Sequence, residues 1–161
     1  MASTLILQRA ENEIKLATII FTISERPALQ TTAFDIEQPE TYYSAVIAHC
    51  YYSIFYAAKA YLHTKGVRVT APEEHKRAFE AFRKFVESGE LDVELLQIYR
   101  EALVRAESLL GIFQIERKKR GEYTYRTFPQ ANKEPANESI EHAKTFYRNL
   151  KAVCEKPSSV S

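Results

Sequence analysis

The sequence predicts an all-α protein, an antiparallel up-and-down bundle of about five helices. Apolar residues recur at intervals of three and four in five separate segments, which is the period of an amphipathic helix. No segment of the sequence shows the alternation of apolar and polar residues that is typical of a half-buried strand. Connections marked by proline or glycine separate the segments, and short links usually join antiparallel neighbours.

The length and composition are those of one globular domain. We expect this domain to span residues 1–156 of the 161, followed by a frayed tail at 157–161. The formal net charge is only +1, so binding to nucleic acid or to a membrane would have to come from a local patch. Polar residues interrupt the N-terminal segment where a signal peptide would be apolar, and the two cysteines lack metal-type spacing. We therefore expect a cytoplasmic protein with reduced thiols.

The first helix is expected from about Ser3 to Ser24, where Pro27 prevents its continuation. Residues Glu25 to Glu40 are polar and rich in threonine, and we interpret them as a connection. The apolar side of this helix comprises Leu7, Ala10, Ile14, Ala17 and Phe21.

The second helix, from Tyr42 to His63, is the element around which the chain is organised. It contains no proline or glycine, and its only full charge is Lys59. A helix that is apolar on nearly every side must be buried on most of them. A membrane span is disfavoured, because tyrosine hydroxyls and His49 in its middle would need partners in lipid. The segment therefore predicts the central helix of a water-soluble bundle.

A third helix follows, and we expect Thr70 and Glu73 to form a capping box at its start. It should end at Gly89 and direct Phe79, Phe82 and Val86 inward.

Asp92 is the expected N-cap of a long fourth helix that reaches the basic run near Lys119. Its apolar line comprises Leu95, Tyr99, Ala102, Ala106, Leu109 and Phe113. Residues Gly121 to Pro135 are expected to form an extended loop, with Pro135 opening the last helix. The inner line of that helix comprises Ile140, Ala143, Tyr147 and Leu150.

The most unusual local composition is the segment ERKKRGEYTYR, residues 116–126. Five cations outnumber two carboxylates in it, and two tyrosines lie among them. Guanidinium groups bind phosphates through paired hydrogen bonds and tyrosine rings stack on bases, so a nucleotide or RNA site would use this combination. The alternative is a solvated helix end, where cations complement the helix dipole. The candidate ligand-binding residues are Arg117, Arg120, Glu122, Tyr123 and Tyr125.

The four histidines show no spacing that is typical of a metal site. We expect His49 to be a hydrogen-bonded core residue of the central helix, and His142 to form a surface pair with Glu138 one turn earlier. Glycine-rich phosphate loops and nucleophile elbows are absent from the sequence. The sequence thus predicts no metal and no cofactor.

Taken together, the segments resemble the HEPN family (higher eukaryotes and prokaryotes nucleotide-binding domain), and most closely its small stand-alone prokaryotic and archaeal members. The resemblance covers nearly the whole chain and is a pattern across it rather than one motif. The segments that carry it are Arg9–Ala17, Tyr43–Gly66, Glu73–Phe82, Glu116–Tyr125 and Glu134–Leu150.

The resemblance implies a helical bundle that commonly forms a two-fold dimer. The family includes metal-independent ribonucleases, toxins paired with a small nucleotidyltransferase antitoxin, and non-catalytic nucleotide-binding partners. Its ribonucleases carry an arginine and a following histidine that are separated by four to six intervening residues. Arg117 and Arg120 match the arginine, but no histidine follows them. Arg68 and His75 match the spacing elsewhere, and we interpret this match as coincidental.

The missing histidine bears on the chemistry, because RNA cleavage without a metal needs an acid or base that titrates near neutral pH. We therefore expect a non-catalytic module that binds a nucleotide, RNA or a nucleotidyltransferase. The alternative is a metal-independent ribonuclease toxin that uses Glu122 or Tyr123 as an unconventional partner. Tyr123 also lies where some family toxins carry a tyrosine that the partner enzyme modifies with AMP. We further expect a homodimer, because the central helix offers more aromatic surface than one bundle of this length easily surrounds.

Overall fold

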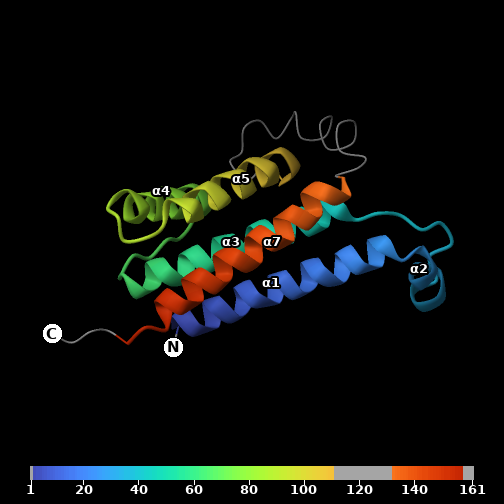
Figure 1. Ribbon diagram of the computed structural model, residues 1–161, viewed down its shortest axis with the longest axis horizontal. Helices are drawn as coiled ribbons and strands as arrows, with labels where there is room; N and C mark the ends of the chain where they lie inside the picture. The colour runs from blue at the N-terminus through green and yellow to red at the C-terminus, as the bar shows by residue number, and fades with distance from the viewer. Residues whose placement is uncertain (1, 111–131, 158–161) are drawn as a thin grey trace.

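The computed structural model describes residues 2–110 and 132–157, and these contain six helices and no strand (Figure 1). The fold is all-α, as predicted. The helices are α1 (Ala2–Glu25), α2 (Pro27–Phe34), α3 (Tyr43–Thr64), α4 (Glu74–Glu87), α5 (Val93–Leu110) and α7 (Lys133–Cys154). None of the helices in these residues is both long and apolar enough to cross a membrane.

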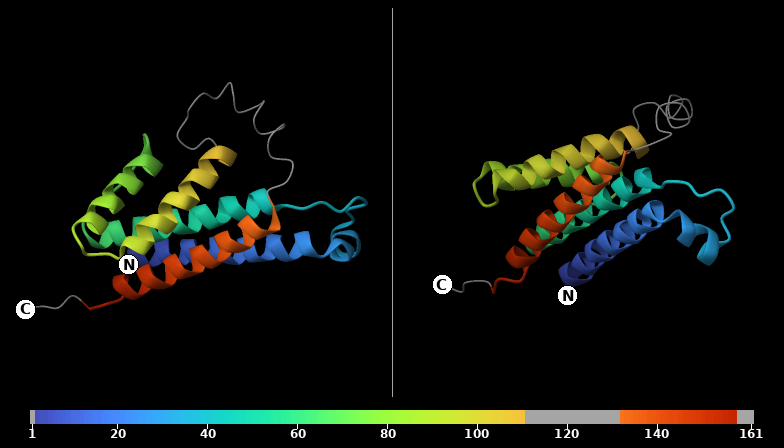
Figure 2. Two further views of the ribbon diagram at one scale, coloured as in Figure 1. Left: turned by 45° about the horizontal axis from the view of Figure 1, so that its top comes forward. Right: turned by 45° about the vertical axis from the view of Figure 1, so that its right-hand side comes forward.

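Helix α3 is the centre of the bundle, and α1, α4, α5 and α7 all pack against it. Helix α1 lies along one outer edge of the bundle, α4 and α5 form a pair at the opposite edge, and α7 lies over α3 between them (Figures 1 and 2). Helix α7 contacts α1, α3 and α5, so the last helix of the chain closes the core. The short α2 extends from the far end of α1 (Figure 1).

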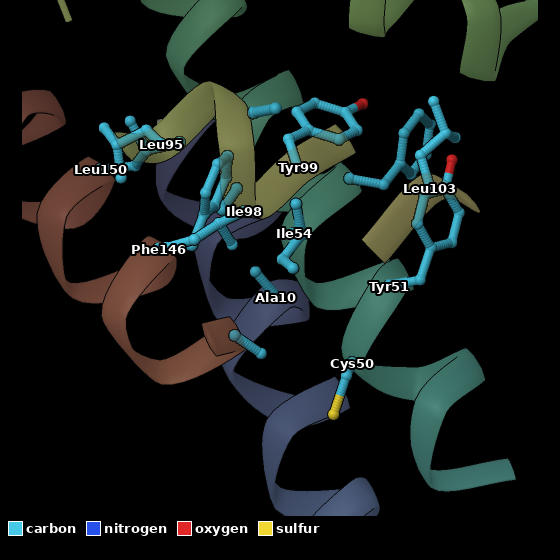
Figure 3. Close-up of a cluster of buried hydrophobic side chains, with 14 of the residues drawn as sticks. Ala10, Cys50, Tyr51, Ile54, Leu95, Ile98, Tyr99, Leu103, Phe146 and Leu150 are labelled. Atoms are coloured by element: carbon cyan, nitrogen blue, oxygen red, sulfur yellow. The ribbon is translucent and has the colours of Figure 1, made fainter. Parts of the chain in front are cut away.

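The core joins small residues of α1 and α3 to aromatic residues of the other helices. Ala10 and Ala17 are fully buried on the inner side of α1, which lets α3 approach closely. Phe82, Tyr99 and Phe146, from α4, α5 and α7, contact one another with ring centroids 5.4–5.8 Å apart. Figure 3 shows side chains from α1, α3, α5 and α7 converging in this core.

The connection after α1 differs from the prediction, because it contains the helix α2. Pro27 ends α1 but also begins α2, since its missing N–H and fixed φ suit a first helical position. Gln30, fully buried, fixes the return of the chain to α3. Its amide group donates to the carbonyls of Ile23 (2.9 Å) and Glu40 (2.7 Å), and its side-chain oxygen accepts from the Glu40 N–H at 2.9 Å.

The capping-box prediction for α4 is wrong. Glu73 occupies the N-cap position with φ of 58°, and no side-chain cap bond forms there. An N-cap side chain needs the extended backbone that Glu73 does not have. The Asp92 prediction is confirmed, because its Oδ1 accepts from the Glu94 N–H at 2.9 Å at the start of α5. Phe82 and Val86 are buried as predicted, and Phe79 packs partly buried against the core.

The last helix begins at Lys133, two residues before Pro135. Ile140, Ala143 and Leu150 are buried as predicted, whereas the fully buried aromatic residue is Phe146 and not the partly buried Tyr147. The expected continuation of the fourth helix to Lys119, the loop 121–131 and the tail residues 158–161 lie outside the described residues.

The other helices of the same chain cover most of α3, whereas the homodimer was predicted on the assumption that one bundle is too small to cover it. Thirteen of its residues are buried within one chain. The side chains of α3 that keep partial exposure in its middle are His49, Tyr52, Tyr56 and Lys59. The dimer therefore remains a prediction, and α3 does not by itself require a second copy.

Candidate functional site at the α5–α7 face

The five residues predicted to bind a ligand lie between α5 and α7 and outside the described residues. They are Arg117, Arg120, Glu122, Tyr123 and Tyr125. The structure does describe the two helices that lead into and out of their segment, where α5 ends at Leu110 and α7 begins at Lys133. We therefore describe the side chains of α5 and α7 near these two helix ends, and call this side of the bundle the α5–α7 face.

An ion pair fixes the point where α7 begins. Lys133 Nζ lies 2.7 Å from Glu25 Oε2, which joins the first residue of α7 to the last residue of α1. The Tyr43 hydroxyl donates a second hydrogen bond to Glu25 from the start of α3. The hydrogen bond from Lys133, and to a smaller extent that from Tyr43, lowers the pKa of Glu25, so its carboxylate stays charged. Three helices therefore meet at one end of the segment.

A polar network joins α5 to α7 on the same face. Arg105 on α5 donates to Glu138 Oε2 at 2.9 Å and to Ser139 Oγ at 3.1 Å, both on α7. His142 lies one turn further along α7, with its two ring nitrogens 3.7 Å from Glu101 and from Glu138. The predicted pairing of His142 with Glu138 is thus present, but it belongs to a larger network between helices.

Part of this network has the side chains of a metal site. Ligand atoms of Glu101, Glu138 and His142 lie within 4.8 Å of one another, and two carboxylates with an imidazole suit several divalent metals. However, the guanidinium of Arg105 already binds Glu138, and its positive charge opposes a cation at the same carboxylate. We interpret the network as a link between α5 and α7 that orients His142.

A small cavity lies beneath the network and reaches the central helix. Arg105 and His142 line its outer part, and Cys50 and Tyr51 of α3 line its inner part. Burial raises the pKa of the Cys50 thiol to about 12, so this sulfur stays protonated and is a weak nucleophile. The cavity has a volume of about 10 Å³, which is no more than one water molecule fills.

Tyr51 joins this cavity to α4. Its hydroxyl lies 2.8 Å from Nδ1 of His75, at the start of α4, and the His75 ring stacks on Phe55 with centroids 4.2 Å apart. Burial lowers the pKa of His75, which favours the neutral imidazole. Sequence analysis missed this pair, because no local pattern joins residues that lie 24 positions apart.

His49 forms a hydrogen bond, as predicted, but it is only partly buried and so is not a core residue. Its Nδ1 lies 2.6 Å from Glu13 Oε2 of α1, so it forms an ion-pair geometry at the α1–α3 boundary. Close by, the guanidinium of Arg9 lies 4.3 Å from the centroid of the Tyr56 ring. Glu13 thus joins α1 to the central helix through its side chain.

The comparisons with known proteins agree with the helical architecture. The model of the HEPN domain family matches residues 28–153, which is most of the chain. A protein of Methanocaldococcus jannaschii named "Putative toxin MJ0142" is 39% identical over 62 residues, or 38% of this chain. The matched region spans 40% of that protein's length. No solved structure matches the chain. With its family match over 28–153 and its all-α bundle, this chain belongs to the HEPN domain family.

Proposed function

We propose that this HEPN protein is the toxin-class component of a two-protein system and that it binds RNA or a nucleotide through its basic segment, residues 116–126. The observation that carries the proposal is the composition of that segment, in which arginines and tyrosines lie together without a histidine. The assignment to the toxin class is supported by membership of the HEPN family and by the relative that is named as a toxin. A small nucleotidyltransferase is the protein partner that we propose on the family resemblance.

The engagement of the histidines supports binding over cleavage. Three of the four histidines have partners within the chain: His49 contacts Glu13, His75 contacts Tyr51, and His142 lies between two glutamates. Arginine stays protonated and cannot serve as the base for the 2′-hydroxyl. A phosphate-binding role requires only the guanidinium groups of the segment.

The test is binding of a labelled single-stranded RNA, and separately of a nucleotide, to wild type and to Arg117→Ala/Arg120→Ala. We expect the wild-type affinity to fall as salt rises, because bound cations release counterions from the phosphates. Loss of two phosphate contacts should weaken binding and reduce the slope of log K against log salt by about 1.4. The control is Lys76→Ala/Lys84→Ala, which removes two exposed cations from α4. A wild type without salt-dependent binding, or equal losses in both variants, would refute the proposal.

A metal-independent ribonuclease is the second candidate, and one observation favours it. Arg105 and His142, from different helices, contact the same Glu138 on the α5–α7 face. Histidine is the side chain that most often serves as the acid or base in catalysis. The test is an RNA cleavage assay in the presence of a metal chelator. Cleavage by the wild type that is lost in His142→Gln and kept in His63→Gln would establish a ribonuclease rather than an RNA-binding protein.

A further inference from the structure

An apolar hollow opens at the end of the bundle where α2 connects α1 to α3. Its volume is about 300 Å³, at the lower end of the range of pockets that hold compact ligands, and its lining is almost entirely apolar. Figure 1 shows α2 and the chain that follows it projecting at this end of the molecule, away from α4. The lining residues come from α1, α2, the connection 35–42 and α3: Ile20, Ile23, Phe34, Ile36, Tyr42 and Ala45.

Hydrogen bonds hold the walls of the hollow in place. The side-chain amide of the buried Gln30 binds the backbone of Glu40 within the connection, and the Ser24 hydroxyl accepts from the Tyr42 N–H at 2.8 Å. Phe34 nevertheless keeps 55% of its surface exposed, so a large aromatic ring meets water at the mouth of the hollow. An exposed apolar surface that is already ordered loses little entropy on binding, which is typical of a docking site.

The rim of the hollow is acidic. Asp35 and Glu37 flank the lining residue Ile36 in the sequence, and Glu40 follows three residues later. These three carboxylates are exposed, and none of them forms an ion pair with another described residue. Helix α2 ends immediately before Asp35, so the negative end of its dipole adds to the charge of the rim. Positive groups are therefore favoured around the mouth of the hollow.

The charge of this end of the bundle differs from that of the whole chain. Residues 16–58 contain four carboxylates and a single cation, Arg26, so their formal charge is −3, whereas the whole chain carries +1. Helix α7 also begins at this end, but Lys133 and Glu134 cancel each other, and Lys133 is bound to Glu25. RNA and acidic lipids are repelled by such a surface. The hollow therefore favours an occupant that combines apolar side chains with positive charge.

We propose that the hollow is the docking site for a basic amphipathic helix of a partner protein. An amphipathic helix presents apolar side chains on one face with cations beside them, and such helices commonly bind in apolar grooves. Its apolar side chains fill the hollow beside Phe34, and its lysines or arginines pair with Asp35, Glu37 and Glu40. Binding of RNA by the basic segment uses no residue of the hollow, so the two proposals can fail separately.

The first test measures the binding of two labelled synthetic peptides, each about four helical turns long, by fluorescence anisotropy. One peptide carries leucines on one face and lysines on the others, and the second replaces every lysine by glutamate. We expect the wild type to bind the leucine–lysine peptide with an affinity that falls as salt rises, and not to bind the leucine–glutamate peptide. Equal binding of the two peptides, or no binding of the leucine–lysine peptide, would overturn the proposal.

The charge of the rim is tested by Asp35→Asn/Glu37→Gln/Glu40→Gln. This variant should bind the leucine–lysine peptide at least about fivefold more weakly, because three exposed ion pairs each contribute a modest amount. Equal losses in this variant and in its control would show a general attraction between the peptide and carboxylates, and would overturn the proposal. The control removes three exposed carboxylates from α4 and α5: Glu80→Gln/Glu87→Gln/Glu94→Gln.

The apolar contact is tested by Phe34→Ser, which should weaken binding of the same peptide about tenfold. Leu5→Ser is the matched control, because Leu5 is 64% exposed at the other end of α1. Both variants should keep the helical circular dichroism of the wild type, since the substituted side chains are exposed. Full affinity in Phe34→Ser, or the same loss in Leu5→Ser, would show that the hollow does not hold the peptide.

The second test locates the bound peptide. The chain contains no tryptophan, so Phe34→Trp places a single indole at the mouth of the hollow, and Val104→Trp places one on the exposed side of α5. The leucine–lysine peptide should shift the emission of Phe34→Trp to shorter wavelength, because it removes water from the indole, and should leave that of Val104→Trp unchanged. Any other pattern would overturn the proposal.

A second copy of the chain is the other possible occupant, and sedimentation equilibrium without peptide tests it. We expect the same mass for the wild type and for Phe34→Ser. A wild-type dimer that Phe34→Ser abolishes would assign the hollow to contact between copies, and would overturn the partner helix as its occupant.

Discussion

The hydroxyl of Tyr51, fully buried in α3, lies 2.8 Å from Nδ1 of His75 in the first turn of α4. This bond satisfies the tyrosine oxygen in the core and holds the start of α4 against the central helix. His75 also stacks on Phe55, so a titratable ring forms part of the packing between two helices. The stability of the fold should therefore depend on the protonation of this ring.

We predict that His75→Gln reduces the loss of stability on acidification. Burial lowers the pKa of His75 below its unfolded value of about 6.5, so the unfolded chain binds the proton more strongly. The free energy of unfolding should then fall as pH decreases through that value toward the folded pKa. Glutamine removes the titration and can still bond Tyr51. Urea unfolding at about pH 7 and pH 5 measures the difference, with His63→Gln as control; an unchanged pH dependence in His75→Gln would contradict the prediction.

We predict that Gln30→Ala costs about 2–4 kcal/mol of stability. The substitution leaves backbone groups of Ile23 and Glu40 without their side-chain partner in a partly buried turn. Chemical denaturation gives the change in unfolding free energy. Thr32→Ala, on the exposed side of the same helix, removes one hydrogen bond and should cost less than about 1 kcal/mol. Equal costs would show that the Gln30 amide does not hold this connection.

Phe55→Ala should destabilise the protein by about 3–5 kcal/mol, because it removes a side chain that is 2% exposed and leaves a cavity between α3 and α4. The midpoint of thermal or denaturant unfolding measures the loss. Arg120→Ala should change the midpoint little, since its proposed role is ligand binding. If Arg120→Ala unfolded the protein, its role would be structural and the site assignment would be wrong.

The two thiols should react at different rates with a thiol reagent in the native state. Burial raises the pKa of Cys50 to about 12 and that of Cys154 to about 11, but Cys50 is also closed off by the core. We expect slow labelling of Cys154 at mildly alkaline pH and labelling of Cys50 only upon unfolding. Mass spectrometry of the labelled peptides distinguishes them, and Cys154→Ser should abolish the early phase. Early labelling at Cys50 would show that the core opens locally.

The positions of the main helices could be predicted because the residues that begin or end a helix, such as a cap or a glycine, lie next to it in the sequence. The central helix was expected from Tyr42 to His63 and spans Tyr43–Thr64, since Gly66 follows it closely. The cap of α5 is a hydrogen bond from the Glu94 N–H to the Asp92 side chain, which are only two residues apart in the sequence. Helix α2 was missed because the bonds that fix its return reach from Gln30 to Glu40, and no local pattern reports them.

Contacts between helices could not be predicted in the same way. Phe146 and Tyr147 are neighbours on α7, and periodicity alone did not distinguish which aromatic ring would enter the core. The contact of His49 with Glu13 joins residues 36 positions apart, and the Tyr51–His75 pair joins residues 24 positions apart. The residues of the basic segment that we predict to bind a ligand lie outside the described residues, so that part of the site remains a prediction from composition.

The closure of the core by α7 has a consequence for biosynthesis. Phe146 and Leu150 are fully buried against the other helices, so a nascent chain that ends before them leaves the packing surfaces of α1 and α3 open. Translation supplies these residues after those of the helices they cover, and the complete core can therefore form only after they have left the ribosome. A domain built in this way acquires its native fold after its synthesis rather than during it.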